Sequence, residues 1–469
     1  MMFVSRTDEL SALNKLYAKN SFQMAVVYGR RRVGKTTLIS EFIKGKPAIF
    51  FPAQEANEHL NLQLFSEKVY GFFGLPKSTG AFRNWHDAFS FIAEKAKEQR
   101  FILAIDEFPC LVSSSKSIKS ILQNIIDHAL KDTGLFLILC GSQISFMERQ
   151  VLSTKSPLFG RRTAQFHIEG FDYYDAAQML PSISNEDKIK YYACVGGTPH
   201  YLSKINPALS FEDNLLDLYF EPQAYLYGEP TMLLQQELRE PAMYNSVISA
   251  VATGSSRLNE ISTKIAEETS KSGKYIKTLL ELRILRREVP FGENPQRSRK
   301  TIYQLADNCF RFWYRYVFLN NVGIETGAGR IIAESMVLPE LSAFIGKPAF
   351  EDVCRQYIIR QNKCKALPFL ATNFGTWWGN DKQQQQLADI DVIADNKPQG
   401  RVLLGECKWR NEATDAGDVK KLLDKSRLLL GYKEYHFMFF SKAPYTQAAL
   451  QLAQENPNLH LITLDMLFE

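Results

Sequence analysis

The chain has 469 residues, 45% of them apolar and 23% charged, which is the composition of an ordinary globular protein and predicts two to four domains. Its net charge of +5 is small for this length, so total charge alone does not indicate a nucleic-acid partner. Seven cysteines without a C-x-x-C pair argue against a disulfide framework and against a structural zinc site.

The opening stretch MMFVSRTDEL has no apolar segment of signal-peptide length, and no later stretch approaches the roughly 18 apolar residues of a membrane span. The most apolar runs, RFILAID and LFLILCG, have the length of buried strands. We therefore expect a cytoplasmic protein with no membrane partner.

The segment MAVVYGRRRVGKTTLISEFI reads as a β-branched strand, a loop and a helix, with the spacing G-x-x-x-x-G-K-T in the loop. Gly29 and Gly34 allow the backbone to wrap around an anion, so that loop amides and the helix N-terminus point at nucleotide phosphates. Lys35 would reach the β- and γ-phosphates, Thr36 would hold Mg²⁺, and Thr37 is a further candidate for nucleotide binding. The alternative is a fortuitous turn, which the strand–loop–helix context disfavours.

The partners that such a loop needs follow in order. The strand in RFILAIDEFP ends at Asp106, which would hold Mg²⁺ through water, and Glu107, which would orient or activate the hydrolytic water. The alternative is an acid pair at a helix start. The strand in LFLILCGSQ ends beside Ser142, a candidate γ-phosphate sensor. With PAIFFPA and AQFHIEG, five short strands alternate with helical segments, which predicts a parallel, doubly wound sheet.

Residues 1 to about 230 resemble the archaeal-type ATPase group, P-loop proteins of the AAA+/STAND kind. The resemblance rests on Phe3, Arg6, Glu9 and Leu10 in the pattern FxxRxxEL, and on YGRRRVGKTTLI, IDEFP, LCGSQ, PLFGRRT and VGGTPHYL. It implies that Arg6 and Glu9 lie near the adenine and that VGGTPHYL belongs to a helical lid.

The same resemblance implies that Arg161 or Arg162 reaches a γ-phosphate, in cis or from a neighbouring subunit, which leaves a homo-oligomer open. A solvated basic turn is the alternative for these two arginines. Gln143 departs from the family pattern, because a second small hydroxyl often follows Ser142, and this puts the coupling of the sensor in doubt.

The middle of the chain, residues 243–316, predicts a winged helix-turn-helix. A first helix ends near Thr253, RLNEISTKIA forms a second, and SGKYIKTLLELRIL forms a third that runs to Leu285. RREVPF and KTIYQLAD then form a hairpin wing. The aromatic segment NCFRFWYRYVFLN that follows is expected in a core or an interdomain helix.

Basic residues concentrate in the third helix and the wing. Within 271–300 nine lysines and arginines oppose three acids. This excess suits contacts with DNA phosphates. The alternative is that the module is a protein–protein spacer.

Near the C-terminus, LADIDVIADNKPQG and RVLLGECKW predict a β-hairpin with Asp391 and Glu406 on adjacent strands and Lys408 two residues after Glu406. Residues i and i+2 of a strand face the same side, so Glu406 and Lys408 can share one site. Two carboxylates and a backbone carbonyl can bind a hard divalent cation, and a lysine can stabilise charge on an attacked phosphate. The alternative is an ordinary surface ion pair.

Residues 345–469 resemble the domain of unknown function attached to archaeal-type ATPases, which looks like a PD-(D/E)XK nuclease. Glu351, in the first turn of the helix in GKPAFEDVCRQYI, matches the helix-borne acid of that superfamily. Ile390 replaces the eponymous proline, and Lys420 and Lys421 are only candidates for a further lysine. The tryptophans of GTWWGND are expected as core or loop anchors rather than as base-stacking groups.

The predicted fold is α/β: a P-loop NTPase core with a parallel sheet (1–170), a helical lid (171–235), a winged helix-turn-helix (236–325) and a restriction-endonuclease-like α/β domain (326–469). The predicted function is ATP binding and hydrolysis coupled to DNA binding and to metal-dependent DNA cleavage, with ATP and Mg²⁺ as cofactors. The alternative is a nucleotide-dependent DNA- or protein-binding switch or scaffold whose nuclease-like domain is inactive.

Overall fold

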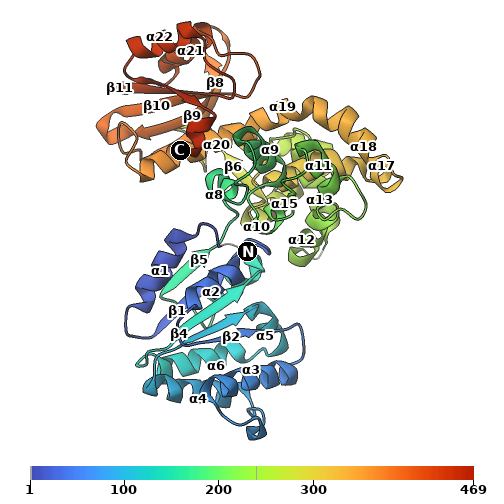
Figure 1. The fold of residues 1–469 in the computed structure, drawn as a ribbon, viewed down its shortest axis with the longest axis vertical. Coiled ribbons are helices and arrows are strands. Elements are labelled where there is room, and N and C mark those ends of the chain that lie inside the picture. Colours follow the sequence, from blue (N-terminus) through green and yellow to red (C-terminus); the bar gives the residue numbers. More distant parts are fainter. Residues whose placement is uncertain (1–2, 239) are drawn as a thin grey trace. The chain divides into compact units, whose positions relative to one another are not determined.

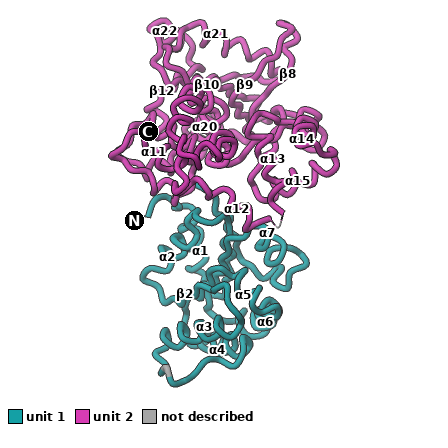
Figure 2. Tube along the Cα trace, turned by 90° about the vertical axis from the view of Figure 1, so that its right-hand side faces the viewer, with its two compact units in different colours: residues 1–170 teal, residues 171–469 magenta. Residues whose placement is uncertain are grey.

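A parallel sheet in the order β2-β3-β4-β1-β5 is the centre of residues 1–170, the first of two compact units (Figures 1 and 2). The structure is a computed structural model that describes residues 3–238 and 240–469. The five strands are β1 (Gln23–Tyr28), β2 (Ala48–Pro52), β3 (Ile102–Asp106), β4 (Phe136–Gly141) and β5 (Ala164–His167). All of their pairings are parallel, which confirms the predicted sheet. Because β4 lies between β1 and β3, the carboxyl ends of these three strands lie side by side.

Helices cover both faces of this sheet. One face, with Val27 and Ile138, packs against α1 and α2; the other, with Val26 and Leu139, packs against α3 to α6. Alternate strand residues point to opposite faces, so strands covered on both sides are apolar throughout. The helices are α1 (Thr7–Tyr17), α2 (Lys35–Ile43), α3 (Glu58–Phe73), α4 (Trp85–Glu98), α5 (Phe108–Ser114), α6 (Ile118–Ile125) and α7 (Ile144–Phe146).

The second unit, residues 171–469, begins with helices. They are α8 (Tyr173–Gln178), α9 (Asn185–Val195), α10 (Pro199–Leu202), α11 (Phe211–Tyr219) and α12 (Glu229–Glu237). Three more helices and a hairpin follow: α13 (Pro241–Ala252), α14 (Leu258–Lys264), α15 (Thr269–Glu281), β6 (Leu285–Glu288) and β7 (Ile302–Leu305). The predicted order of three helices and a hairpin is therefore present.

The predicted end of the third helix was wrong. Helix α15 stops at Glu281, Arg283 adopts a left-handed φ of 55°, and Leu285 is already the first residue of β6. The residues after the hairpin form α16 (Asn308–Phe312), α17 (Asn321–Glu325), α18 (Gly329–Ile332) and α19 (Leu341–Phe344). The aromatic segment that includes Phe310 and Tyr314 is buried, which confirms the expectation of a core segment.

A mixed sheet in the order β12-β11-β10-β9-β8 ends the chain. Its strands are β8 (Asn373–Asp381), β9 (Gln386–Asn396), β10 (Arg401–Lys408), β11 (Glu434–Ser441) and β12 (Leu459–Thr463). Strands β8, β9 and β10 are antiparallel neighbours, whereas β10, β11 and β12 are parallel. Helix α20 (Glu351–Lys363) packs on one face, and α21 (Ala416–Asp424) and α22 (Gln447–Glu455) pack on the other.

The hairpin β6–β7 is joined to this sheet through its loop. The amide of Phe291 donates a 2.8 Å hydrogen bond to the carbonyl oxygen of Thr376 on the edge strand β8. The ring of Phe291 lies over Gly375, where a Cβ atom would approach within 2.9 Å of it. Glycine at this position therefore lets the hairpin loop pack directly on β8.

Candidate functional site

The glycine-rich loop between β1 and α2 has a backbone that side chains would obstruct. A Cβ atom at Gly29 would lie 2.1 Å from the carbonyl oxygen of Ile168, and Gly34, which precedes α2, has a φ of 93°. Both positions therefore need glycine, one for space and one for its conformation. The loop ends at the N-terminus of a helix, where backbone amides are free to bind phosphate.

Three predicted nucleotide-site residues meet at the carboxyl ends of the strands. The Thr36 hydroxyl donates a 2.7 Å hydrogen bond to Asp106 Oδ2, and Lys35 Nζ donates at 2.8 Å to the carbonyl oxygen of Arg30. Burial lowers the pKa of Lys35, while nearby negative groups, including Glu107 and Asp106, oppose that shift. A buried ammonium surrounded by loop backbone is suited to an anionic ligand.

Glu107 and Ser142 also come together, from the ends of β3 and β4. The Ser142 hydroxyl donates a 2.9 Å hydrogen bond to Glu107 Oε2, and the amide of Glu107 donates at 3.0 Å to Asp106 Oδ1. Glu107 has a φ of 50°, a left-handed conformation that is uncommon outside glycine and marks a constrained position. Thr37 lies one residue further into α2.

Arg6 contacts the backbone that flanks the loop. Its guanidinium donates at 3.1 Å to the carbonyl oxygen of Val33, donates to the carbonyl oxygen of Glu169, and pairs with Glu9 at 3.1 Å. Arg6 and Glu9 thus connect the start of the N-terminal helix to the backbone of the glycine-rich loop.

Arg161 and Arg162 differ in their surroundings. Arg161 makes a two-point ion pair with Asp127, at 2.5 and 2.8 Å, whereas Arg162 makes one 3.4 Å contact with the carbonyl oxygen of Leu152. Thr163, the next residue, donates from its amide to the carbonyl oxygen of Met24 near the start of β1.

Both arginines therefore lie near the amino ends of the parallel strands, whereas the glycine-rich loop lies at the carboxyl ends. The four residues of β5 separate them from that loop, roughly 13 Å at 3.3 Å per residue. At this distance neither arginine reaches phosphates bound by its own chain, so action on a neighbouring chain and a solvated basic turn are the two alternatives that stand.

The predicted C-terminal residues converge where the carboxyl end of β10 lies beside the middle of β9. These strands pair up to Gly405 and Val392, which sets Glu406 opposite Asp391. Asp391 Oδ2 accepts a 2.8 Å hydrogen bond from the amide of Cys407, and Lys408 Nζ lies 2.5 Å from Glu406 Oε1. Burial alone would lower the pKa of Lys408, but Glu406 raises it, so the lysine stays charged.

Glu351 completes this cluster from the start of α20. Burial, and then the charge of Asp391, raise the pKa of Glu351, while Lys347 opposes the shift from 3.2 Å. Burial and the charge of Glu406 likewise raise the pKa of Asp391. Carboxylates that disfavour one another's ionisation are expected where a cation binds.

Three charged residues of this cluster were not predicted from the sequence. Lys425 lies 2.6 Å from Glu406 and 3.7 Å from Asp389, and Lys347 lies 3.0 Å from Asp389. Lys420 and Lys421, the candidates for a further lysine, are both exposed, and Lys421 pairs with Asp418 rather than with this cluster. The i, i+2 spacing of Asp389 and Asp391 on one strand was the available signal.

The cluster fits Mg²⁺ held in part by substrate. Among the described residues, no group of three or more His, Cys, Asp and Glu side chains is placed to hold a metal by itself. Mg²⁺, however, usually keeps several waters and binds through one or two carboxylates together with substrate phosphate. Asp391 and Glu406, on neighbouring strands, supply that pair.

The basic segment 271–300 is largely at the surface. Eight of its nine cations are exposed: Lys271, Lys274, Lys277, Arg283, Arg287, Arg297, Arg299 and Lys300. The exception is Arg286, which pairs with Asp352 and Glu288. Arg286 is therefore structural, and the other eight can meet a polyanion.

Comparisons with known proteins agree with the first unit. Residues 3–205 match a family described as an ATPase domain predominantly from Archaea, and residues 313–421 match a family described as archaeal and bacterial proteins of unknown function. Together with the glycine-rich loop and the parallel sheet, this match makes the first unit an ATPase-type P-loop NTPase domain.

A relative extends over nearly the whole chain. The protein named "Uncharacterized protein MJECL04", from Methanocaldococcus jannaschii, is 32% identical over 437 residues, which covers 92% of this chain and 94% of that protein. The chain belongs to the same family as this archaeal protein. "Uncharacterized ATP-binding protein MJ0423" of the same organism is 46% identical over 46 residues, covering 10% of this chain and 78% of that protein.

The fold is similar to that of a solved archaeal ATPase. The Walker-type ATPase PABY2304 of Pyrococcus abyssi superposes with a TM-score of 0.50 at 18% sequence identity, over 67% of this chain and 96% of that chain. At this identity the likeness concerns the fold alone.

Proposed function

We propose that this protein binds and hydrolyses ATP and uses the nucleotide cycle to control Mg²⁺-dependent cleavage of DNA. The observation that carries the nuclease part is the meeting of Glu351, Asp391, Glu406 and Lys408, which come from one helix and two strands. The mixed sheet with helices on both faces is consistent with the restriction-endonuclease-like domain expected from the sequence.

The nucleotide half of the proposal follows from the hydrogen bonds around the glycine-rich loop. The loop amides and Lys35 bind the phosphates, and the Thr36–Asp106 pair marks where Mg²⁺ would bridge protein and nucleotide. Glu107, which accepts a 2.9 Å hydrogen bond from Ser142, would orient the attacking water. A bound γ-phosphate would compete for the Ser142 hydroxyl, so that loss of this hydrogen bond would signal ATP. The ATP-binding relative matched over 46 residues supports this choice of nucleotide.

Arg162 would act on the nucleotide of a neighbouring chain. It lies near the amino ends of the strands, away from the glycine-rich loop of its own chain. Unlike Arg161, which forms a two-point ion pair with Asp127, it makes a single 3.4 Å contact with the carbonyl oxygen of Leu152. An arginine supplied in trans stabilises charge on the transferred phosphoryl group. Hydrolysis would therefore require a homo-oligomer.

In the cleavage half, Mg²⁺ would polarise the scissile phosphate and lower the pKa of a bound water. Asp391 and Glu406 would hold it, with Asp391 oriented by the amide of Cys407. Lys408, now paired with Glu406, would turn to the phosphate oxygens once that carboxylate has another partner. Glu351, whose raised pKa suits a proton acceptor, would take the proton of the attacking water.

DNA would approach through the three-helix and hairpin segment. Its exposed cations suit phosphate contacts, and its hairpin loop packs on the edge strand of the C-terminal sheet. We accordingly assign residues 171–235 to a lid, 236–325 to a winged helix and 326–469 to the nuclease domain.

A second candidate has its own supporting observation. Lys347, Lys408 and Lys425 together form ion pairs with Glu351, Asp389 and Glu406, and so balance three of the four carboxylates of the cluster without a metal. A nucleotide-dependent DNA- or protein-binding scaffold, with lysines in place of the metal, would have this arrangement.

One experiment separates the two candidates. Full-length protein is incubated with single-stranded, duplex and branched DNAs in Mg²⁺ or Mn²⁺, with and without ATP, beside Asp391→Ala and Lys35→Ala. The proposal predicts cleavage that Asp391→Ala abolishes and that Lys35→Ala uncouples from ATP. If protein that hydrolyses ATP cuts none of these DNAs, the scaffold is the better description.

A further inference from the structure

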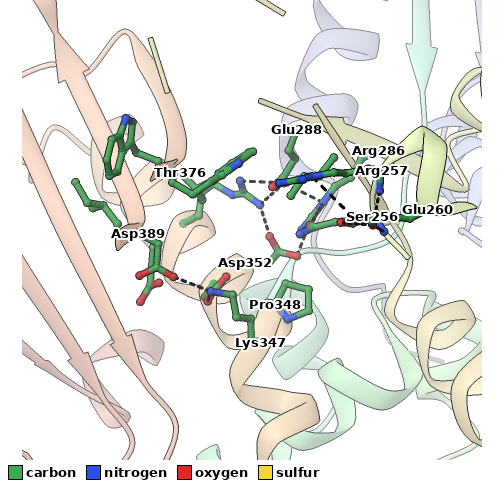
Figure 3. Close-up of a pocket in the computed structure, with 18 residues that line it drawn as sticks. Ser256, Arg257, Glu260, Arg286, Glu288, Lys347, Pro348, Asp352, Thr376 and Asp389 are labelled. Atoms are coloured by element: carbon green, nitrogen blue, oxygen red, sulfur yellow. Dashed lines mark hydrogen bonds and ion pairs between the residues drawn. The ribbon is translucent and has the colours of Figure 1, made fainter. Parts of the chain in front are cut away.

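Two connected depressions lie beside the candidate cleavage residues. The first, called here the inner cleft, has a volume of about 370 Å³ and is lined at one end by Lys347, Glu351, Asp389 and Asp391. In Figure 3, Lys347 and Asp389 point toward each other at this end, while Asp352, Arg286 and Arg257 extend along the other. The second, the outer groove, has a volume of about 700 Å³ and reaches Lys300, Lys382 and Leu387. Both are lined by Arg257, Trp377, Trp378 and Asp389, so they are continuous.

The two depressions have opposite charge. Three cations line the outer groove, Arg257, Lys300 and Lys382, against the single carboxylate of Asp389. The inner cleft is lined by six carboxylates against four cations, and its acidic end brings Glu351, Asp389 and Asp391 together beside Lys347. A phosphate chain would bind along the basic groove and would enter the acidic end only with divalent cations to screen it.

Trp378 stands where the depressions meet. It is partly exposed, and it lies opposite Asp389 in the pairing of β8 with β9. Its neighbour Trp377 packs against the core cluster around Ile390, whereas Trp378 is not among the residues of that cluster. An indole partly open to solvent beside cations is the arrangement with which proteins stack an unpaired base.

We propose that the outer groove binds an unpaired strand of DNA, stacks one base on Trp378, and leads its backbone to the acids of the inner cleft. This inference rests on the proposed function and adds a substrate class to it: DNA with a single-stranded overhang or flap. Depressions of this size hold ligands of small-molecule dimensions, which admits unpaired nucleotides and excludes a duplex. Binding a stacked base also requires that it be unpaired.

The test measures binding by fluorescence anisotropy in Ca²⁺, with full-length protein and four labelled probes: a DNA oligonucleotide, an RNA oligonucleotide, a blunt DNA duplex and a duplex with an overhang. Single-stranded and overhang DNA should bind at least tenfold more tightly than blunt duplex. Trp378→Ala should weaken binding of these two by roughly 5- to 150-fold, the range for one stacked base, and Trp378→Phe should restore most of the loss.

A comparison of Arg257→Ala with Arg330→Ala tests whether the positive charge of the outer groove contributes to DNA binding. The two side chains are similarly exposed, at 61% and 64%, but Arg330 lies outside both depressions. Arg257→Ala should weaken single-strand binding and lessen its salt dependence, and Arg330→Ala should change neither. Equal binding by wild type and Trp378→Ala, or tighter binding of RNA than of DNA, would overturn the inference.

The binding and cleavage measurements can contradict the groove and the nuclease independently of each other. Trp378-dependent binding without cleavage in Mg²⁺ would support the groove and contradict the nuclease. Cleavage by Trp378→Ala protein that binds as wild type does would contradict the groove and leave the nuclease in place.

Discussion

Arg286 Nη1 lies 2.7 Å from Asp352 Oδ2, which joins the hairpin strand β6 to the helix whose first residue is Glu351 (Figure 3). Glu288 on the same strand contacts Arg286 at 3.1 Å and Arg355 at 3.4 Å, and Arg355 in turn contacts Asp352. Charges of opposite sign thus alternate between the hairpin and the helix. A displacement of the hairpin by DNA would be transmitted to the position of Glu351.

Asp352→Ala should destabilise the second unit by about 3 kcal/mol, because it removes a buried carboxylate and leaves Glu288 as the one carboxylate of this network in contact with both Arg286 and Arg355. The matched control is Glu340→Ala, which removes an exposed 2.9 Å pair with Arg315 and should cost about 0–1 kcal/mol. Thermal unfolding followed by circular dichroism compares the two. Equal melting temperatures for both variants would show that the network contributes nothing to stability.

Gly29→Ala should destabilise the first unit by about 1–3 kcal/mol and abolish nucleotide binding, because its Cβ would meet the carbonyl oxygen of Ile168 at 2.1 Å. Gly134→Ala is the control, since the nearest atom to its Cβ, on Arg100, is 3.5 Å away. Binding of a fluorescent ATP analogue and thermal unfolding measure both effects. Normal nucleotide binding by Gly29→Ala would contradict the packing of Ile168 on the loop.

The nucleotide site could largely be anticipated from sequence, for a physical reason. Parallel strands end at the same edge, so a glycine-rich loop after β1 and acids after β3 must come together, as Thr36 and Asp106 do. The sequence pattern could not separate Arg161 from Arg162, because the difference lies in Asp127, 34 residues earlier in the chain.

Arg162→Ala should abolish ATP hydrolysis without weakening ATP binding, because the arginine lies far from its own phosphate loop. Lys35→Ala should abolish both. A mixture of the two inactive proteins should regain part of the activity, since a chain with an intact loop then meets a neighbour with an intact arginine. Steady-state phosphate release measures this. A mixture as inactive as its components would contradict action in trans, and Arg161→Ala should instead lower the melting temperature.

Lys425→Ala should reduce DNA cleavage by an order of magnitude or more, because Lys425 lies 2.6 Å from Glu406 and only 17% of its side chain is exposed. Lys421→Ala, on the preceding turn and 78% exposed, should cut DNA as wild type does. Initial rates of cleavage in Mg²⁺ compare them. Equal rates for all three proteins would exclude Lys425 from the site.

In the C-terminal cluster, sequence analysis could bring together only the residues that lie on a single hairpin, β9–β10. The alternation of strand residues indicates that Asp391, Glu406 and Lys408 lie on the same side of one hairpin. Lys347, just before α20, and Lys425, just after α21, contact acids of the same cluster. No local sequence pattern predicts which residue near the end of α21 comes close to Glu406. Arg286 was counted among surface cations for the same reason, since its partner Asp352 is 66 residues away.

Binding of Mn²⁺ to ATP-free protein together with phosphorothioate forms of the single-stranded, duplex and branched DNAs, followed by electron paramagnetic resonance, tests the central claim, because substrate phosphate completes the proposed metal site. Carboxylate sites for Mg²⁺ also accept Mn²⁺. Asp391→Asn can still accept the Cys407 amide hydrogen bond, so the fold is kept while a ligand charge is removed. Glu434→Gln, on β11 beside Arg401, is the control. Wild type and Glu434→Gln should bind Mn²⁺ at a site that Asp391→Asn lacks; equal binding by all three proteins would contradict a metal-dependent nuclease.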